Sequence, residues 1–132
     1  MGRMALRWEI LHPEKLVLIT GDGIVTLKDV EAYLDDIVTA GAMPYGKLFD
    51  ATTVVPQHDD HDVMMLGARM SAYSSTLVGG PLAFVTVDKA TTEVIERYIN
   101  LTPAKRPVGV FKTVAEARLW LDAQPLPDSS TS

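Results

Sequence analysis

The chain has 132 residues, of which 47% are hydrophobic and 22% are charged, and these proportions predict one folded domain rather than a disordered chain. No cysteine is present, which excludes disulfides, thiolate nucleophiles and cysteine-ligated metal sites. A diffuse net charge of −5 disfavours binding to nucleic acid or to an anionic membrane surface, both of which select basic patches.

The first part of the chain predicts three strands and one helix. Residues 6–12 place hydrophobic side chains at every second position, which is typical of a half-buried edge strand. Residues 15–20 are mostly apolar and predict a strand that is covered on both faces, with the glycine-rich residues 21–23 ending it. Residues 26–41 have hydrophobic side chains at helical spacing, and residues 45–52 predict the next strand.

The second part alternates helices with strands. Residues 62–75 have hydrophobic side chains at helical spacing. Residues 82–87 are mostly apolar and predict a strand that is buried on both faces. A second helix is predicted over residues 89–101 and a last strand over residues 106–111. Residues 113–124 predict the closing helix.

Capping residues support the predicted helix starts. Thr26 with Asp29 forms an acidic variant of the capping box, and Thr113 with Glu116 forms the standard one. Asp88 precedes the helix over residues 89–101 and is a typical N-cap residue.

The resulting order, ββαβαβαβα, predicts an α/β domain over residues 1–123. Strands that alternate with helices form a mostly parallel sheet, here of about five strands with about four helices. The first strand is expected to pair antiparallel at an edge of the sheet, because only a short turn separates it from the second. Residues 124–132 contain prolines and small polar residues and predict a disordered C-terminal tail.

Three segments resemble the STAS domain family, and within it the small bacterial SpoIIAA-like proteins related to anti-sigma-factor antagonists. The segments are "LVLITGDGIVTLKDVEAYLDDI", "KLFDATTV" and "VGVFKTVAEARLWL". The last is the most specific, with a strand that ends in phenylalanine and a helix that is capped by threonine. The resemblance covers roughly residues 7–122. It implies a central sheet with one antiparallel edge strand, in a protein that acts through interactions with other proteins.

In the regulated members of that family, a kinase phosphorylates a serine at the start of the helix that follows the strand equivalent to "LFD". Counted from Asp50, that position falls on Asp59 or Asp60 in this chain. We therefore expect no switching by serine phosphorylation. An aspartate here either caps the helix, where negative charge suits the helix dipole, or permanently imitates the phosphorylated state.

The resemblance and the residue pattern both predict a partner-binding surface over residues 52–65. This segment follows the carboxyl end of a strand and mixes apolar side chains with concentrated charge. The predicted contact residues are Thr52, Thr53, Val54, Val55, Pro56, His58, Asp59, Asp60, Met64 and Met65.

Polar residues at the other strand ends form a second candidate site for a ligand. Asp22, Asp50, Asp88 and Lys112 each lie at or just after the predicted carboxyl end of a strand, where open α/β sheets bind ligands. The alternative is that they stabilise turns and helix starts.

The histidines of "HDDHD" raise the question of a metal site. His58 and His61 are three residues apart, but no HExxH motif or complete ligand set is present. We therefore expect no metal and no cofactor. No nucleophile with a matching base is visible either, so no catalytic residue is assigned.

These patterns predict a non-enzymatic interaction module that binds an unknown protein partner. We expect a cytoplasmic protein without stable membrane insertion or nucleic-acid binding, and a homodimer is compatible with the sequence. One alternative is a small-molecule or lipid carrier with an apolar pocket between sheet and helices. A further alternative is a metal-dependent enzyme.

Overall fold

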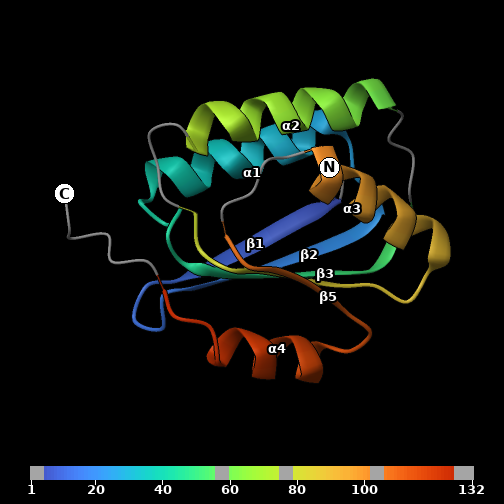
Figure 1. Cartoon of the computed structure of the whole chain (residues 1–132). Coiled ribbons are helices and arrows are strands. Elements are labelled where there is room, and N and C mark those ends of the chain that lie inside the picture. The colour runs from blue at the N-terminus through green and yellow to red at the C-terminus, as the bar shows by residue number, and fades with distance from the viewer. Residues whose placement is uncertain (1–4, 56–59, 75–78, 102–105, 127–132) are drawn as a thin grey trace.

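A five-stranded sheet separates two layers of helices (Figure 1). The structure is a computed structural model, and it describes residues 5–55, 60–74, 79–101 and 106–126. Its elements are β1 (Leu6–Leu11), β2 (Leu16–Ile24), α1 (Leu27–Thr39), β3 (Gly46–Val55), α2 (Asp60–Ser74), β4 (Leu82–Val85), α3 (Lys89–Leu101), β5 (Val108–Phe111) and α4 (Val114–Asp122).

The strands lie side by side in the order in which they occur in the sequence. β1 pairs antiparallel with β2, so that Leu6 faces Gly21 and Leu11 faces Leu16. The pairs β2–β3, β3–β4 and β4–β5 are all parallel. This confirms the predicted α/β order, with a mostly parallel sheet and one antiparallel edge strand.

Helices α1, α2 and α3 cover one face of the sheet, and α4 covers the other (Figure 1). Each of the first three helices connects a strand to the next parallel strand in the same direction. Because such crossovers share one hand, their helices lie on one face. α4 follows the last strand and is not a crossover, so it is free to return to the opposite face.

Side-chain caps begin the helices as predicted. The hydroxyl of Thr26 accepts the backbone N–H of Asp29 at 3.1 Å, and the Asp29 carboxylate accepts the N–H of Thr26 at 3.0 Å, which completes a capping box. The Asp88 carboxylate accepts a backbone N–H in the first turn of α3 at 3.0 Å. The hydroxyl of Thr113 accepts the backbone N–H of Glu116 at 3.1 Å and donates to the Glu116 carboxylate at 3.2 Å. The predicted cap of α4 is therefore present, but its capping box is only half formed.

The glycine-rich residues 21–23 do not end β2, contrary to the sequence-based prediction. β2 continues to Ile24, and its pairing with β3 shifts register between Thr20 and Asp22. A Cβ atom on Gly21 would lie 2.5 Å from the side chain of Val54, so glycine permits the close approach of the two strands. The glycines therefore accommodate a bulge instead of stopping the strand.

The alternation of side chains along the strands produces separate cores on the two faces. On the face of α4, Leu48 and Val85 pack with Ala117 and Leu121. On the face of α1 to α3, β2 contributes Val17 and Ile19, which pack with Tyr33, Leu34 and Ile37 of α1. Phe84 of β4 packs with Ile95 of α3 on that same face.

Several predicted features fall in undescribed parts of the chain. Pro56, His58 and Asp59 lie outside the described residues, as do residues 127–132 of the predicted tail. Asp60 begins α2, but its side chain lies outside the described part of the structure. Within the described ranges, every helix is too short or too polar to cross a bilayer.

Candidate functional site

A pocket of about 140 Å³ lies between the sheet and helices α1, α2 and α3. Phe49 and Phe84 line it from the sheet, and Leu66 lines it from α2. Tyr33 of α1 and Tyr98 of α3 contribute the aromatic parts of the helical wall. The remaining wall is mostly aliphatic, so the pocket offers an apolar molecule a place away from water.

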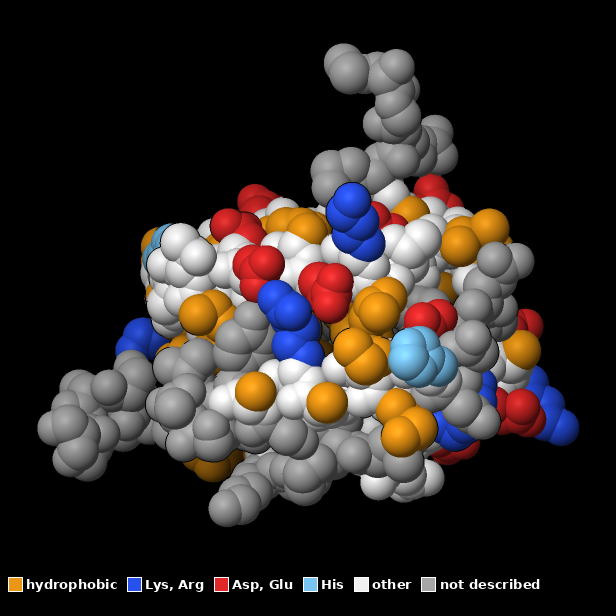
Figure 2. Space-filling view, turned by 90° about the horizontal axis from the view of Figure 1, so that it is seen from above, with side chains coloured by type: hydrophobic (Ala, Val, Ile, Leu, Met, Phe, Trp, Pro, Cys, Tyr) orange, Lys and Arg blue, Asp and Glu red, His pale blue; other side chains and the backbone are white. Residues whose placement is uncertain are grey.

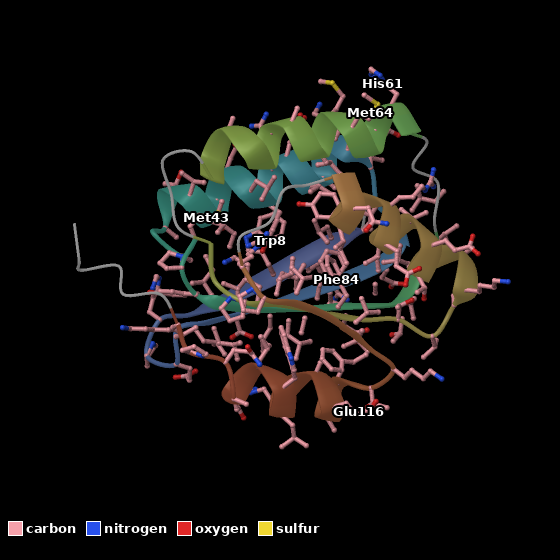
Figure 3. All side chains as sticks on the ribbon, viewed as in Figure 1. Trp8, Met43, His61, Met64, Phe84 and Glu116 are labelled. Carbon is pink, nitrogen blue, oxygen red and sulfur yellow. The ribbon has the colours of Figure 1, made fainter. Side chains whose placement is uncertain are left out.

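The period of β3 explains which residues reach the pocket. Lys47, Phe49 and Ala51 alternate along the strand and all line the pocket, whereas Leu48 packs against α4 on the opposite face. The Phe49 ring lies 5.7 Å from the Phe84 ring of the neighbouring strand, measured between centroids, and the two planes are tilted by 38°. Phe84 projects from the sheet toward the helices (Figure 3).

Lys47 is the most unusual residue of the pocket, because only 3% of its surface is exposed. Its Nζ donates hydrogen bonds to the backbone carbonyl oxygens of Met43 at 2.5 Å and Tyr45 at 2.9 Å. Burial lowers the pKa of Lys47 well below its ordinary value of 10.5, and the nearby charge of Arg106 lowers the pKa further. The chain therefore holds an amine in the core at a considerable electrostatic cost.

A close contact between two loops fixes the carbonyls that face Lys47. The N–H of Gly80 donates to the Met43 carbonyl at 2.9 Å. A Cβ atom on Gly80 would overlap the carbonyl oxygens of Pro44 and Tyr45, so only glycine fits here. The loop before β4 thus holds the loop before β3 in place, and with it the acceptors of the Lys47 amine.

Arg106 brings a second basic side chain to the same pocket. This half-buried residue lies just before β5 and lines the pocket, and its guanidinium Nη1 is 3.5 Å from the Gly80 carbonyl oxygen. Burial raises the pKa of Tyr33, and the charge of Arg106 opposes part of that increase. Among the described residues that line the pocket there is no aspartate or glutamate that would stabilise a positive charge on either basic side chain.

The residues of the predicted partner-binding surface differ in how exposed they are. Val55, Met64 and Met65 are exposed, with 46%, 62% and 47% of their surface accessible. His61 and Met64 project from the outer side of α2, away from the sheet (Figure 3). Seen from above the helical layer, small groups of hydrophobic side chains lie among charged ones (Figure 2).

Three other members of that surface contact neighbouring residues; Thr52 and Val54 are half-buried, whereas Thr53 is exposed. Val54 lines the pocket, because β3 continues past the predicted end of the strand and turns this side chain inward. The hydroxyl of Thr53 donates to the Gly21 carbonyl at 2.9 Å. The hydroxyl of Thr52 donates to the Asp50 carboxylate at 2.7 Å.

The four residues predicted at the carboxyl ends of the strands have local contacts or face solvent. Asp50 accepts the backbone N–H and the hydroxyl of Thr52, and Asp88 caps α3. Asp22 lies within β2 rather than after it, and Lys112 is exposed. In the described ranges, no three histidines, aspartates or glutamates lie close enough together to hold a metal ion.

The polar residues of the pocket, which are Lys47, Tyr33 and Arg106, were not identified from the sequence. One signal for Lys47 was present: a lysine at a strand position that alternates with Phe49 must point to the same covered face. For Arg106 no comparable signal exists, because its position near Lys47 depends on how β5 is placed in the sheet.

Comparisons with known proteins bear on the fold. No protein-family model matches the sequence, and no curated protein matches it. Among solved structures, the chain is similar to a DUF3478-family protein with a SpoIIAA-like fold from Shewanella loihica PV-4. The match has a TM-score of 0.61 at 17% sequence identity and covers 92% of this chain and 97% of that chain. The protein therefore has the SpoIIAA-like α/β fold that its resemblance to the STAS family implied.

Proposed function

We propose that this chain is a non-enzymatic binding protein that holds a small apolar molecule in the pocket between its sheet and helices α1 to α3. The observation that carries the proposal is the pocket itself, of about 140 Å³ and with mostly apolar walls. A buried apolar cavity of about 150 Å³ is large enough to bind benzene. A molecule built around one ring or a short hydrocarbon chain therefore matches the pocket in size.

The chemistry of the pocket supports binding rather than catalysis. Its described lining contains no histidine, serine, aspartate or glutamate that would serve as a nucleophile or general base, and the Lys47 amine is engaged by the Met43 and Tyr45 carbonyl oxygens. The hydroxyl of Thr91 lines the pocket, but it is engaged by the Val54 carbonyl oxygen at 3.3 Å and by the Asp88 carboxylate at 3.2 Å. We therefore place the function in the retention of a ligand.

A fluorescent apolar probe tests this proposal, with native mass spectrometry to detect any ligand that co-purifies. We expect saturable binding with one site per chain. Val94→Trp fills the pocket from α3 and should abolish binding, whereas Val114→Trp adds the same bulk on exposed α4 and should not. A folded wild-type protein that binds no apolar probe, or a folded Val94→Trp variant that binds as well as the wild type, contradicts the proposal.

A second candidate function is the recognition of a protein partner through the exposed apolar residues near the end of β3. Val55 lies opposite Ile24 in the sheet, and both side chains are exposed. Met64 and Met65 add flexible apolar side chains, which adapt to varied partners. Val55, Met64 and Met65 are the members of the predicted interaction surface with exposed apolar side chains, and Ile24 adds an exposed side chain from outside the predicted set.

Charge at this surface tests the second function. The double substitution Met64→Glu with Met65→Glu should abolish capture of a partner in a pull-down, or dissociate a homodimer in sedimentation experiments. Leu119→Glu changes an exposed leucine on α4, on the opposite face of the sheet, and serves as the control. If the double variant and the control behave alike, the interaction surface lies elsewhere.

We also propose that phosphorylation at the start of α2 does not regulate the chain. The nearby hydroxyls of Thr52 and Thr53 already donate to Asp50 and to the Gly21 carbonyl, which makes them poor acceptors for a kinase. Detection of phosphate on either threonine in the native organism would argue against this.

A further inference from the structure

The two basic side chains of the pocket lie at one end of it. Lys47 is the second residue of β3, and Arg106 lies two residues before β5 begins. Both side chains therefore enter the pocket at the amino-terminal edge of the parallel strands, opposite to the edge where α/β sheets usually bind ligands. From there the pocket runs along the strands toward Val55 and Thr91, between apolar walls.

This arrangement gives the described pocket lining no anion that would stabilise a protonated Lys47, so the free protein disfavours the charged amine. A buried cation is strongly unfavourable unless an anion or several hydrogen bonds compensate for it. Two backbone carbonyls accept hydrogen bonds from Lys47, whereas a charged amine has three donors. Because no carboxylate is present in the described lining, an anionic ligand would supply the negative charge that lets Lys47 take up a proton as the ligand binds.

The hydroxyl of Tyr33, which lies within reach of the charge of Arg106, is suited to the same anion. Tyr33 is buried, and its side chain lines the pocket together with Tyr98. Burial raises the pKa of Tyr33, so its hydroxyl keeps its proton and acts as a neutral donor. The charged end of the pocket thus combines an amine, a guanidinium and a protonated phenol, all of which donate hydrogen bonds.

We propose that the ligand of this pocket is a small apolar carboxylic acid, whose carboxylate binds between Lys47 and Arg106 while its hydrocarbon body packs against Phe49, Phe84 and Ile95. The inference rests on the proposed function, since it names the chemical class of the molecule that the pocket holds. A planar guanidinium matches the two oxygens of a carboxylate, and hydrogen bonds between charged groups are the strongest available to such a ligand.

The size and the walls of the pocket favour a carboxylate over a phosphate. A phosphate monoester carries up to two negative charges, and moving it into a pocket with such apolar walls costs more hydration energy than moving a singly charged carboxylate. A carboxylate has a single charge and two oxygens, so the amine and the guanidinium can neutralise it. The rest of the ligand must then be apolar and about the size of one aromatic ring or a six-carbon chain.

Matched pairs of acids and neutral amides test the inference by calorimetry at neutral pH. Phenylacetate and hexanoate are compared with phenylacetamide and hexanamide, which have nearly the same shape and no charge. We expect at least one of the acids to bind at least about tenfold more tightly than its amide, because hydrogen bonds between charged groups are worth at least that factor. Lys47→Met should remove this preference and leave the affinity for the amide almost unchanged.

Two further variants make the test independent of how well Lys47→Met folds. Arg106→Gln should reduce the preference for the acid in the same way, because it removes the second cation. Lys112→Met removes an exposed lysine outside the pocket and should leave the preference unchanged.

The outcomes separate this inference from the proposed function. If an acid and its amide bind equally well and Val94→Trp abolishes both, the pocket binds apolar molecules but the carboxylate inference is wrong. If the preference for the acid survives in folded Lys47→Met and Arg106→Gln variants, the inference is also wrong. If neither acids, amides nor the apolar fluorophore bind to the folded wild type, both the function and the inference fail.

Discussion

Lys47 places an ionisable amine in the central strand of the sheet. Its contribution to the free energy of unfolding therefore changes with pH in a direction that can be worked out. Its pKa is lowered in the folded protein, chiefly by burial, while the unfolded chain has the ordinary value of 10.5. Between these two values the unfolded chain binds one more proton than the folded protein at this site. The contribution of Lys47 to the free energy of unfolding therefore rises with pH, by up to about 1.4 kcal/mol per pH unit.

We expect Lys47→Met to remove this dependence. The other ionisable side chains of the pocket are Arg106 before β5, Tyr33 of α1 and Tyr98 of α3. The raised pKa of Tyr33 affects stability only above about pH 10, where the phenol of the unfolded chain ionises. Urea unfolding between about pH 6 and pH 9.5 should thus give a steeper rise for the wild type than for Lys47→Met.

Lys112→Met is the control for this comparison, since Lys112 is exposed on the surface and should not alter the pH dependence. Curves for the wild type and Lys47→Met that stay parallel over the whole range would show that Lys47 remains protonated in the folded protein. That result would require an acceptor for its charge within the free protein.

The role of Lys47 illustrates what a single residue in a sequence reveals. The alternation with Phe49 places Lys47 on the covered face of the sheet, and this was accessible from the sequence. The acceptors of its amine were not, because the Met43 and Tyr45 carbonyls belong to a loop whose path depends on Gly80. Such contacts between distant segments leave no local pattern.

At the scale of elements, α4 covers one face of the sheet, while α1, α2 and α3 cover the other (Figure 1). Leu121 has 7% of its surface exposed and packs with Leu48 and Val85. Leu119, on the same helix, has 74% of its surface exposed. The two leucines therefore form a matched pair, with the same side chain and helix but opposite environments.

Leu121→Ala is expected to lower the free energy of unfolding by about 2–5 kcal/mol, because it removes buried methyl groups and leaves a cavity. Leu119→Ala should change it by no more than about 0.5 kcal/mol. Chemical denaturation monitored by tryptophan fluorescence, to which Trp8 and Trp120 both contribute, would measure both effects. Equal effects of the two substitutions would mean that α4 does not pack on the sheet through Leu121.

Element type was predictable along the chain, whereas the ends of the strands were not. Helical periodicity and the caps at Thr26, Asp88 and Thr113 identified where helices begin, because these signals are local. β2 and β3 extend past their predicted ends, since their last residues are held by pairing with each other, as Ile24 is with Val55. Pairing between strands is a tertiary contact and overrides the turn-forming tendency of the glycines.

At the scale of the whole molecule, the two faces of the sheet are packed differently. α4 contacts β3, β4 and β5 directly, while α1, α2 and α3 leave a pocket above the sheet. The sequence predicted this layered architecture but located its ligand candidates at the carboxyl edge, on Asp50 and Asp88. Those carboxylates instead hold Thr52 and the first turn of α3. The pocket is a property of how the layers fit together, which hydrophobic periodicity does not encode.

This difference between the faces predicts where a ligand stabilises the molecule. The pocket lining includes Leu66 of α2 and residues of α1 and α3, but no residue of α4. A ligand that fills the pocket supplies packing contacts to those three helices, so their local opening should become rarer. Hydrogen exchange of the saturated protein should therefore slow in α1, α2 and α3, while amides of α4 that exchange by local opening should be unaffected. Equal protection of α4 would instead mean that these amides exchange only through global unfolding, or that the ligand binds outside the pocket.

The Val94→Trp variant separates these two explanations. Its hydrogen exchange should respond to the ligand only if the ligand binds outside the pocket.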